Sequence, residues 1–105
     1  MEKIVKDGRV AVAISPGYGA GWSTWNGRHS ELLIFHPKII GMIQAERQKE
    51  ITEKWMNDNF ELPNIYTGGA SQLEIEWVSV GKKFTIIEND GSEQILSEDD
   101  LQFTA

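Results

Sequence analysis

The stretch LEIEWVSVGKKFTIIENDGSEQIL, residues 73–96, decides the fold that we expect for this chain. Its first part alternates apolar and acidic residues, which is typical of an antiparallel strand with one face buried. Gly81 predicts a turn into a second strand, KKFTIIE, and Asn89-Asp90-Gly91 predict a turn into a third, SEQIL. The short run LQF, residues 101–103, predicts a last strand. The C-terminal part therefore indicates a meander of three or four strands.

A further pair of strands is expected at the N-terminus. The segments Lys3–Lys6 and Arg9–Ser15 are rich in Val and Ile, and Asp7-Gly8 between them is a strong hairpin signal. In the second segment Val and Ile alternate with Ala11 and Ala13. These small side chains indicate that one face of the strand packs closely against another element or another subunit.

The middle of the chain predicts helical structure. The apolar run Glu31–Phe35, which we interpret as a short strand, is followed by Pro37, a residue that suits the first turn of a helix. The next apolar residues fall three, four or eight apart, as an amphipathic helix requires: Ile39, Ile40, Ile43, Ile51, Trp55 and Met56. Because Glu46–Glu50 is wholly polar, we expect a bend there or two short helices.

These elements predict an α+β fold. An antiparallel sheet, made of the N-terminal hairpin and the C-terminal meander of three to four strands, would carry one or two central helices packed on one face. The length of 105 residues fits a single domain spanning residues 1–105.

Composition narrows the class of function. Sixteen acidic residues against ten basic ones give a net charge of −6, which argues against direct binding of nucleic acid or of an anionic membrane. The chain has no cysteine, so a disulfide scaffold and a cysteine nucleophile are excluded. No segment has the roughly 20 apolar residues that span a bilayer, and the first residues do not read as a signal peptide, so a cytosolic protein is expected.

The candidate binding site is the loop SPGYGAGWSTWNGRH, residues 15–29. Its aromatic rings can stack on a planar base, its hydroxyl and amide side chains can meet base edges or ribose, and its arginine can hold a phosphate. Glycines at alternate positions allow a ligand to approach the main chain closely. The predicted ligand-binding residues are Tyr18, Gly19, Gly21, Trp22, Ser23, Thr24, Trp25, Asn26 and Arg28.

The alternative for this loop is purely architectural, and for each of Trp22 and Trp25 burial in the core is as good an interpretation as contact with a ligand. The spacing G-x-G-x-G matches neither the dinucleotide-binding fingerprint nor the phosphate-binding loop of NTPases. His29 and His36 are seven residues apart without further ligands at zinc spacing. No nucleophile–base pair is evident, so we expect a non-catalytic protein without metal or cofactor.

Several motifs resemble those of a family of small proteins carried by phages and prophages of Firmicutes. They are SPGYGAGWSTW, ELLIFHPKII, YTGG and the closing LEIEWVSVGKKFTI with ENDGSE, which together span most of the chain. Asn89 stands where the family commonly has tyrosine before the last Asp-Gly. Small phage proteins of this build often antagonise bacterial immunity, so the resemblance implies a counter-defence protein acting in the host cytosol.

Two modes of counter-defence are implied. In the first, similar to anti-CBASS and anti-Thoeris sponges, a homo-oligomer binds a cyclic-nucleotide or ADP-ribose-type messenger through the loop without cleaving it. In the second, similar to anti-CRISPR inhibitors, an acidic face binds a nuclease or effector directly; its residues would be Glu46, Glu50, Glu53, Glu74, Glu76, Glu88, Asp90, Glu93, Glu98, Asp99 and Asp100. A phage accessory or assembly protein is a third possibility. The first mode is the one that the aromatic and glycine-rich loop favours.

Overall fold

The first sheet joins the N-terminal hairpin to a strand from the C-terminal half. In the computed structural model, which describes residues 1–97 and 103–105, β1 (Val5–Lys6), β2 (Arg9–Ile14) and β3 (Glu74–Ser79) are antiparallel in the order β1-β2-β3. Asp7 and Gly8 have φ values of 52° and 74°, the left-handed pair that closes a tight hairpin. The predicted N-terminal hairpin is therefore confirmed.

The second sheet contains β4 (Lys83–Asn89), β5 (Ser92–Leu96) and β6 (Phe103–Thr104), antiparallel in the order β5-β4-β6. Strand β3 pairs with β2 and not with β4, so the C-terminal strands are divided between two sheets and do not form one continuous meander. Strand β6 returns along the side of β4 opposite to β5. Leu101 and Gln102, the first residues of the predicted last strand, lie outside the described residues.

Three α-helices occupy the middle of the described chain: α1 (Ser30–Phe35), α2 (Pro37–Gln44) and α3 (Glu53–Phe60). Four 3₁₀ turns accompany them: η1 (Ser23–Trp25), η2 (Gly27–His29), η3 (Gln48–Glu50) and η4 (Ala70–Gln72). The helical region is interrupted in the polar stretch, as predicted, and Pro37 is at the start of α2.

The interpretation of Glu31–Phe35 as a strand is wrong, because these residues form most of α1. The physical reason lies in what the run must bury. Leu33 packs in the core on the helical side, whereas Ile34 and Phe35 pack in the core between the sheets. A single helical turn can direct consecutive side chains into both cores.

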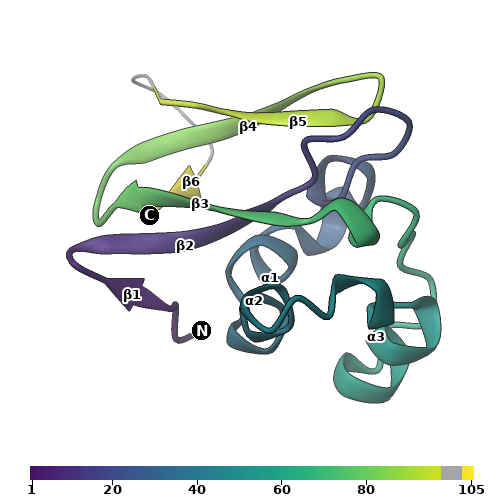
Figure 1. Ribbon diagram of the computed structural model, residues 1–105. Coiled ribbons are helices and arrows are strands. Elements are labelled where there is room, and N and C mark those ends of the chain that lie inside the picture. The colour runs from purple at the N-terminus through teal and green to yellow at the C-terminus, as the bar shows by residue number, and fades with distance from the viewer. Residues whose placement is uncertain (98–102) are drawn as a thin grey trace.

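Strand β2 is buried on both faces and separates the two cores. Ala11 and Ala13 face the helices, whereas Val10, Val12 and Ile14 face the second sheet. Figure 1 shows this order: β4 and β5 lie on one side of β2 and β3, and the helices lie on the other. The alanines give the helices room to approach the sheet, as their small size predicts. The α+β class with antiparallel strands is confirmed.

Two of the four tryptophans, those outside the glycine-rich loop, border the core on the helical side. Trp55 on α3 and Trp77 on β3 are both partly buried and pack against that core. No helix in the described part of the chain combines the length and apolar character that crossing a bilayer would need.

Candidate functional site

A buried carboxylate holds the glycine-rich loop in place. Glu93, on β5, is 0% exposed, and its Oε1 accepts a hydrogen bond from the amide of Ser15 at 2.8 Å. Its Oε2 accepts from the amides of Trp22 at 2.8 Å and Thr24 at 3.1 Å, and from the Thr24 hydroxyl at 2.6 Å. Three backbone N–H groups of the loop thus surround an anion that the chain itself supplies. These amides are not available to a phosphate.

Close approach of backbones explains much of the glycine in and around the loop. A Cβ on Gly91 would lie 2.7 Å from Cα of Ala20, and one on Gly69 would lie 2.6 Å from the Ala20 carbonyl oxygen. The loop therefore passes between the β4–β5 turn and the segment before η4 with no space for a side chain on either. The amide of Gly19, one of the predicted ligand contacts, donates to the carbonyl of Asp90 at 2.6 Å.

Trp22 belongs to the core. It is 0% exposed, and its indole Nε1 donates to the carbonyl of Leu33 at 2.9 Å. No face of the ring is open to solvent, so in this conformation Trp22 cannot stack on a bound base. Burial in the core and contact with a ligand were the two interpretations of Trp22, and in the structure it is buried in the core.

Trp25, in contrast to Trp22, lies at the surface. It is 42% exposed and packs against Tyr66, itself 48% exposed, with ring centroids 5.2 Å apart. Asn26 fixes the pair: its side-chain amide donates to the carbonyls of Trp22 (2.8 Å) and Tyr66 (3.0 Å), and its Oδ1 accepts from the Tyr66 amide (2.9 Å). The Asn26 side chain is therefore used within the protein, while the two rings present a fixed aromatic surface.

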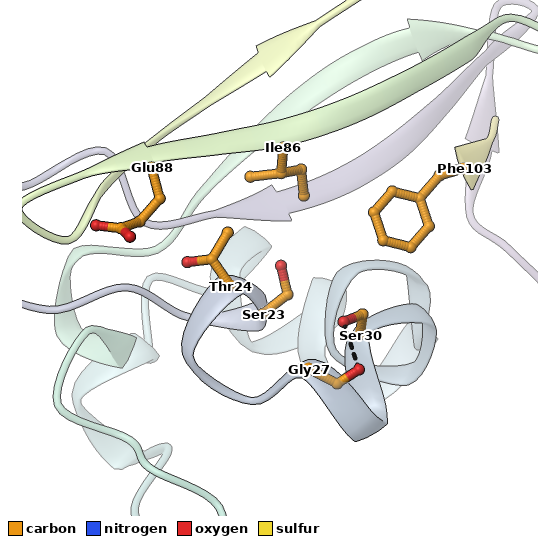
Figure 2. Close-up of a pocket in the computed structure, with 7 residues that line it drawn as sticks. All are labelled: Ser23, Thr24, Gly27, Ser30, Ile86, Glu88 and Phe103. Carbon is orange, nitrogen blue, oxygen red and sulfur yellow. Dashed lines mark hydrogen bonds between the residues drawn. The ribbon is translucent and has the colours of Figure 1, made fainter. Parts of the chain in front are cut away.

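A groove lies on the other flank of η1. A cavity of about 350 Å³ separates the η1–η2–α1 segment from β4 and β6, and it is lined by Ser23, Thr24, Gly27, Ser30, Ile86, Glu88 and Phe103. Figure 2 shows the serine and threonine side chains on one wall and Ile86, Glu88 and Phe103 on the other. The Ser30 hydroxyl donates to the Gly27 carbonyl at 3.0 Å, and one carboxylate oxygen of Glu88 accepts from the Gly91 amide at 2.7 Å.

The groove continues along η2 and α1. A second cavity of about 430 Å³ shares Gly27, Ser30 and Phe103 with the first and adds Arg28, His29, Glu31 and Leu32. We call the two cavities together the loop groove. A third cavity, of about 270 Å³, shares Glu88 with the first and is lined by the 73% exposed Tyr18.

The predicted site residues thus separate into groups. Ser23, Thr24 and Arg28 line the loop groove, and Tyr18 lies at the neighbouring cavity. The others lie away from the groove lining: Trp22 in the core, Asn26 and Gly19 in internal hydrogen bonds, Trp25 on the outer surface, and Gly21 buried against Thr24 and Trp25.

Sequence reasoning missed the opposite wall of the groove and the residue that holds the loop. Glu88, Ile86 and Phe103 come from strands far from the loop in sequence, and Ser30 was not singled out. A signal for Glu93 was present, because it closes the ENDGSE motif in which Gly91 also lies.

Not every carboxylate of the predicted acidic face is exposed and free of partners. Glu93 is buried. Glu50 is exposed but forms an ion pair with Arg47 at 2.7 Å, and the hydrogen bond from Arg47 holds the pKa of Glu50 below its usual range. Glu98, Asp99 and Asp100 lie outside the described residues. The other residues of the predicted acidic face are exposed: Glu46, Glu53, Glu74, Glu76, Glu88 and Asp90.

The two histidines have separate surroundings. His29 lines the loop groove, whereas His36 caps α2, its Nδ1 accepting from the Lys38 amide at 3.1 Å. Partial burial, and then the nearby Lys38 charge, lower the pKa of His36. Within residues 1–97 and 103–105, no group of three His, Asp or Glu side chains is placed to hold a metal ion. Comparisons with protein-family models, curated proteins and solved structures found no match.

Proposed function

We propose that this protein binds a nucleotide-type ligand in the loop groove and sequesters it without cleaving it. The observation that carries the proposal is the chemistry of the groove lining. Hydroxyls from Ser23, Thr24 and Ser30 face the apolar side chains of Ile86 and Phe103, and Arg28 lies along the adjoining part. Hydroxyl, apolar and cationic groups are what the sugar, base and phosphate of a nucleotide each require.

The sugar would lie near Glu88. A carboxylate that accepts from ribose hydroxyls is a recurrent device of nucleotide sites. One oxygen of Glu88 accepts from the Gly91 amide, and that bond fixes the direction of the side chain. The other oxygen makes no hydrogen bond within the described residues. On the facing wall, the Thr24 and Ser30 hydroxyls already donate to Glu93 and to the Gly27 carbonyl, so they would act as acceptors toward a ligand, whereas the Ser23 hydroxyl can donate or accept.

The phosphate would lie near Arg28. This guanidinium is exposed and makes no hydrogen bond or ion pair with any of the residues that the structure describes. Its planar fork can hold two phosphate oxygens at once, which a lysine cannot do. The amides of Ser15, Trp22 and Thr24 already bind Glu93, and the Gly19 amide donates to Asp90, so the phosphate partner that the proposal takes from the loop is Arg28.

Sequestration requires tight binding, which a single open groove does not easily provide. A messenger present near 1 µM must be bound by more than about 8 kcal/mol. A second copy of the chain closing over the groove would enclose the ligand, so the proposal includes a homo-oligomer. Taken with the resemblance to phage proteins, the ligand class is an immune signalling molecule: a cyclic oligonucleotide or a cyclic ADP-ribose isomer.

The test is a thermal-unfolding screen of the purified chain against cyclic di- and trinucleotides and cyclic ADP-ribose isomers. A ligand at a hundredfold excess over its dissociation constant stabilises by about 2.7 kcal/mol, which raises the unfolding midpoint by about 10 °C or more in a domain of this size. We expect one ligand to give this shift, and Arg28→Ala and Ser30→Ala to reduce it.

Arg47→Ala is the matched control, because it removes the same charge from an exposed ion pair on the η3 side of the molecule. It should leave the ligand-induced shift unchanged. A screen without any shift overturns the proposal and directs attention to a protein partner for the acidic surface. A shift that persists in Arg28→Ala and Ser30→Ala would exclude the loop groove as its origin.

A further inference from the structure

A second concave region lies at the other end of β2 from the glycine-rich loop. Arg9 begins the strand and Ile14 ends it, so the β1–β2 turn and the loop are at opposite ends of the sheet (Figure 1). The β1–β2 turn meets the β3–β4 turn there, since the amide of Val80 donates to the carbonyl of Gly8 at 3.0 Å. Side chains from two distant parts of the sequence are therefore brought together.

The strand register places a tryptophan beside cationic side chains. Lys6 is opposite Arg9, Arg9 is opposite Ser79, and in the next row of the same face Ala11 is opposite Trp77. Directly opposed residues of antiparallel strands point to the same face, and so do residues two apart. The face is covered by helices at Ala11 and is exposed at Lys6 and Arg9. Trp77, which is partly buried, lies at the border between these regions.

Two cavities meet around this tryptophan. One, of about 430 Å³, is lined by Lys6, Asp7, Arg9 and Trp77. The other, of about 300 Å³, lies at the free edge of β3: it again includes Arg9 and Trp77, adds Lys82 from the β3–β4 turn, and is also lined by Glu76 and Val78 from the opposite face of β3 and by Ile95 and Ser97. Because the two cavities share Arg9 and Trp77, they adjoin at the edge of β3, and we call them together the Trp77 cleft.

The cleft is a cationic region on an acidic protein. Three of the ten basic residues line it: Lys6, Arg9 and Lys82. In the described part of the chain, Lys6, Arg9 and Lys82 take part in no ion pair. Two acidic residues also line the cleft: Asp7 in the β1–β2 turn, and Glu76 at the edge of β3.

We propose that the Trp77 cleft binds a small phosphorylated ligand with a planar ring, of the nucleoside monophosphate class. The ring would stack on the exposed part of Trp77, and the phosphate would lie between Arg9 and Lys82. Asp7, Glu76 and the net charge of −6 disfavour a long polyanion, so one phosphate fits better than a nucleic acid strand. The proposal is independent of the loop groove, which shares no residue with this cleft.

The test is an NMR titration of the full chain with AMP, following the indole N–H signal of Trp77. The signal is assigned by its disappearance in Trp77→Phe. We expect a saturable shift with AMP and much weaker responses to adenosine and to inorganic phosphate, since each lacks one half of the recognised chemistry. Arg9→Ala and Lys82→Ala should each raise the dissociation constant about tenfold. Both side chains are exposed, so these variants should fold.

Lys49→Ala, on η3, and Arg28→Ala, in the loop groove, are the controls and should leave the AMP titration of Trp77 unchanged. An AMP response that survives Arg9→Ala and Lys82→Ala overturns the cleft as a phosphate site. Inorganic phosphate acting as strongly as AMP overturns the role of the ring. A single-stranded oligonucleotide binding far more tightly than AMP would contradict the preference for a small ligand.

Discussion

The carboxylate of Glu93 lies 2.8 Å from the backbone nitrogen of Trp22, although 71 residues separate the two in the sequence. The same carboxylate also holds Ser15 and Thr24. The part of the loop that leads into η1 is therefore held by Glu93, a residue of the β4–β5 hairpin. This bond positions Ser23 and Thr24 against β4 and so shapes one wall of the loop groove.

Replacing Glu93 by glutamine should destabilise the protein by about 3 kcal/mol, because an amide nitrogen would face donors that now share a carboxylate. Chemical denaturation measures this loss. Glu74→Gln is the matched control, since Glu74 is exposed on β3, and it should change stability by less than about 0.5 kcal/mol. Equal stability of the two variants would refute the role of Glu93 as the anchor of the loop.

The two tryptophans of the loop should respond differently to truncation. Trp22→Ala removes a fully buried ring and the bond to Leu33, so it should cost about 3–5 kcal/mol. Trp25→Ala acts on a side chain that is 42% exposed and should cost about 1 kcal/mol or less. Urea unfolding of both variants gives the comparison, and a reversed order would contradict the placement of the two rings.

Alanine substitutions at two glycines in hairpin turns should distinguish the cost of backbone strain from the cost of a steric overlap with a neighbouring segment. Gly8 and Gly91 both have positive φ, 74° and 85°, but a Cβ on Gly8 meets open space whereas one on Gly91 would overlap the Ala20 backbone. Gly8→Ala should therefore cost about 1 kcal/mol, and Gly91→Ala clearly more, about 3 kcal/mol. Thermal unfolding of the pair tests whether the loop is in contact with the β4–β5 turn.

The helix cap at His36 predicts a pH dependence. The ring nitrogen Nδ1 accepts from the Lys38 amide only when it is unprotonated, and the pKa of His36 is below its ordinary value. The folded state thus favours the neutral ring, so this contribution is present above the ordinary pKa near 6.5 and is lost as the pH falls through the lower folded value. The melting temperature measured from pH 8 to pH 5 should fall by less in His36→Asn, because asparagine caps without titrating.

The sequence predicted the local elements well and the long-range contacts poorly. Asp7-Gly8 and Asn89-Asp90-Gly91 are residue types that favour the backbone conformations of tight turns, so both turns could be predicted locally. The polar stretch Glu46–Glu50 interrupts the helices where expected. The helix α1 (Ser30–Phe35) was missed, because its six residues hold too few periods to distinguish a helix from a strand. Its conformation depends on two cores that only the folded chain brings together.

The candidate site shows the same division. Aromatic and glycine content identified residues 15–29 as a structured loop, but nothing local distinguishes Trp22, which is buried, from Trp25, which is exposed. The environment of Trp22 is set by Leu33 and Glu93, and the far wall of the groove comes from β4 and β6. The position of Glu93 in the ENDGSE motif was a signal for a role, but nothing local indicated that its side chain is buried, since acidic side chains in strands are mostly exposed.

The most direct test of sequestration in the loop groove is a depletion and release measurement. The chain is mixed with each cyclic nucleotide or cyclic ADP-ribose isomer, passed through an ultrafilter that retains protein, and then heated to release what it holds. The proposal predicts that one ligand is depleted from the filtrate and recovered chemically unchanged after heating, and that Arg28→Ala leaves it in the filtrate. Depletion of none of these ligands, or recovery of a cleaved product, would contradict it.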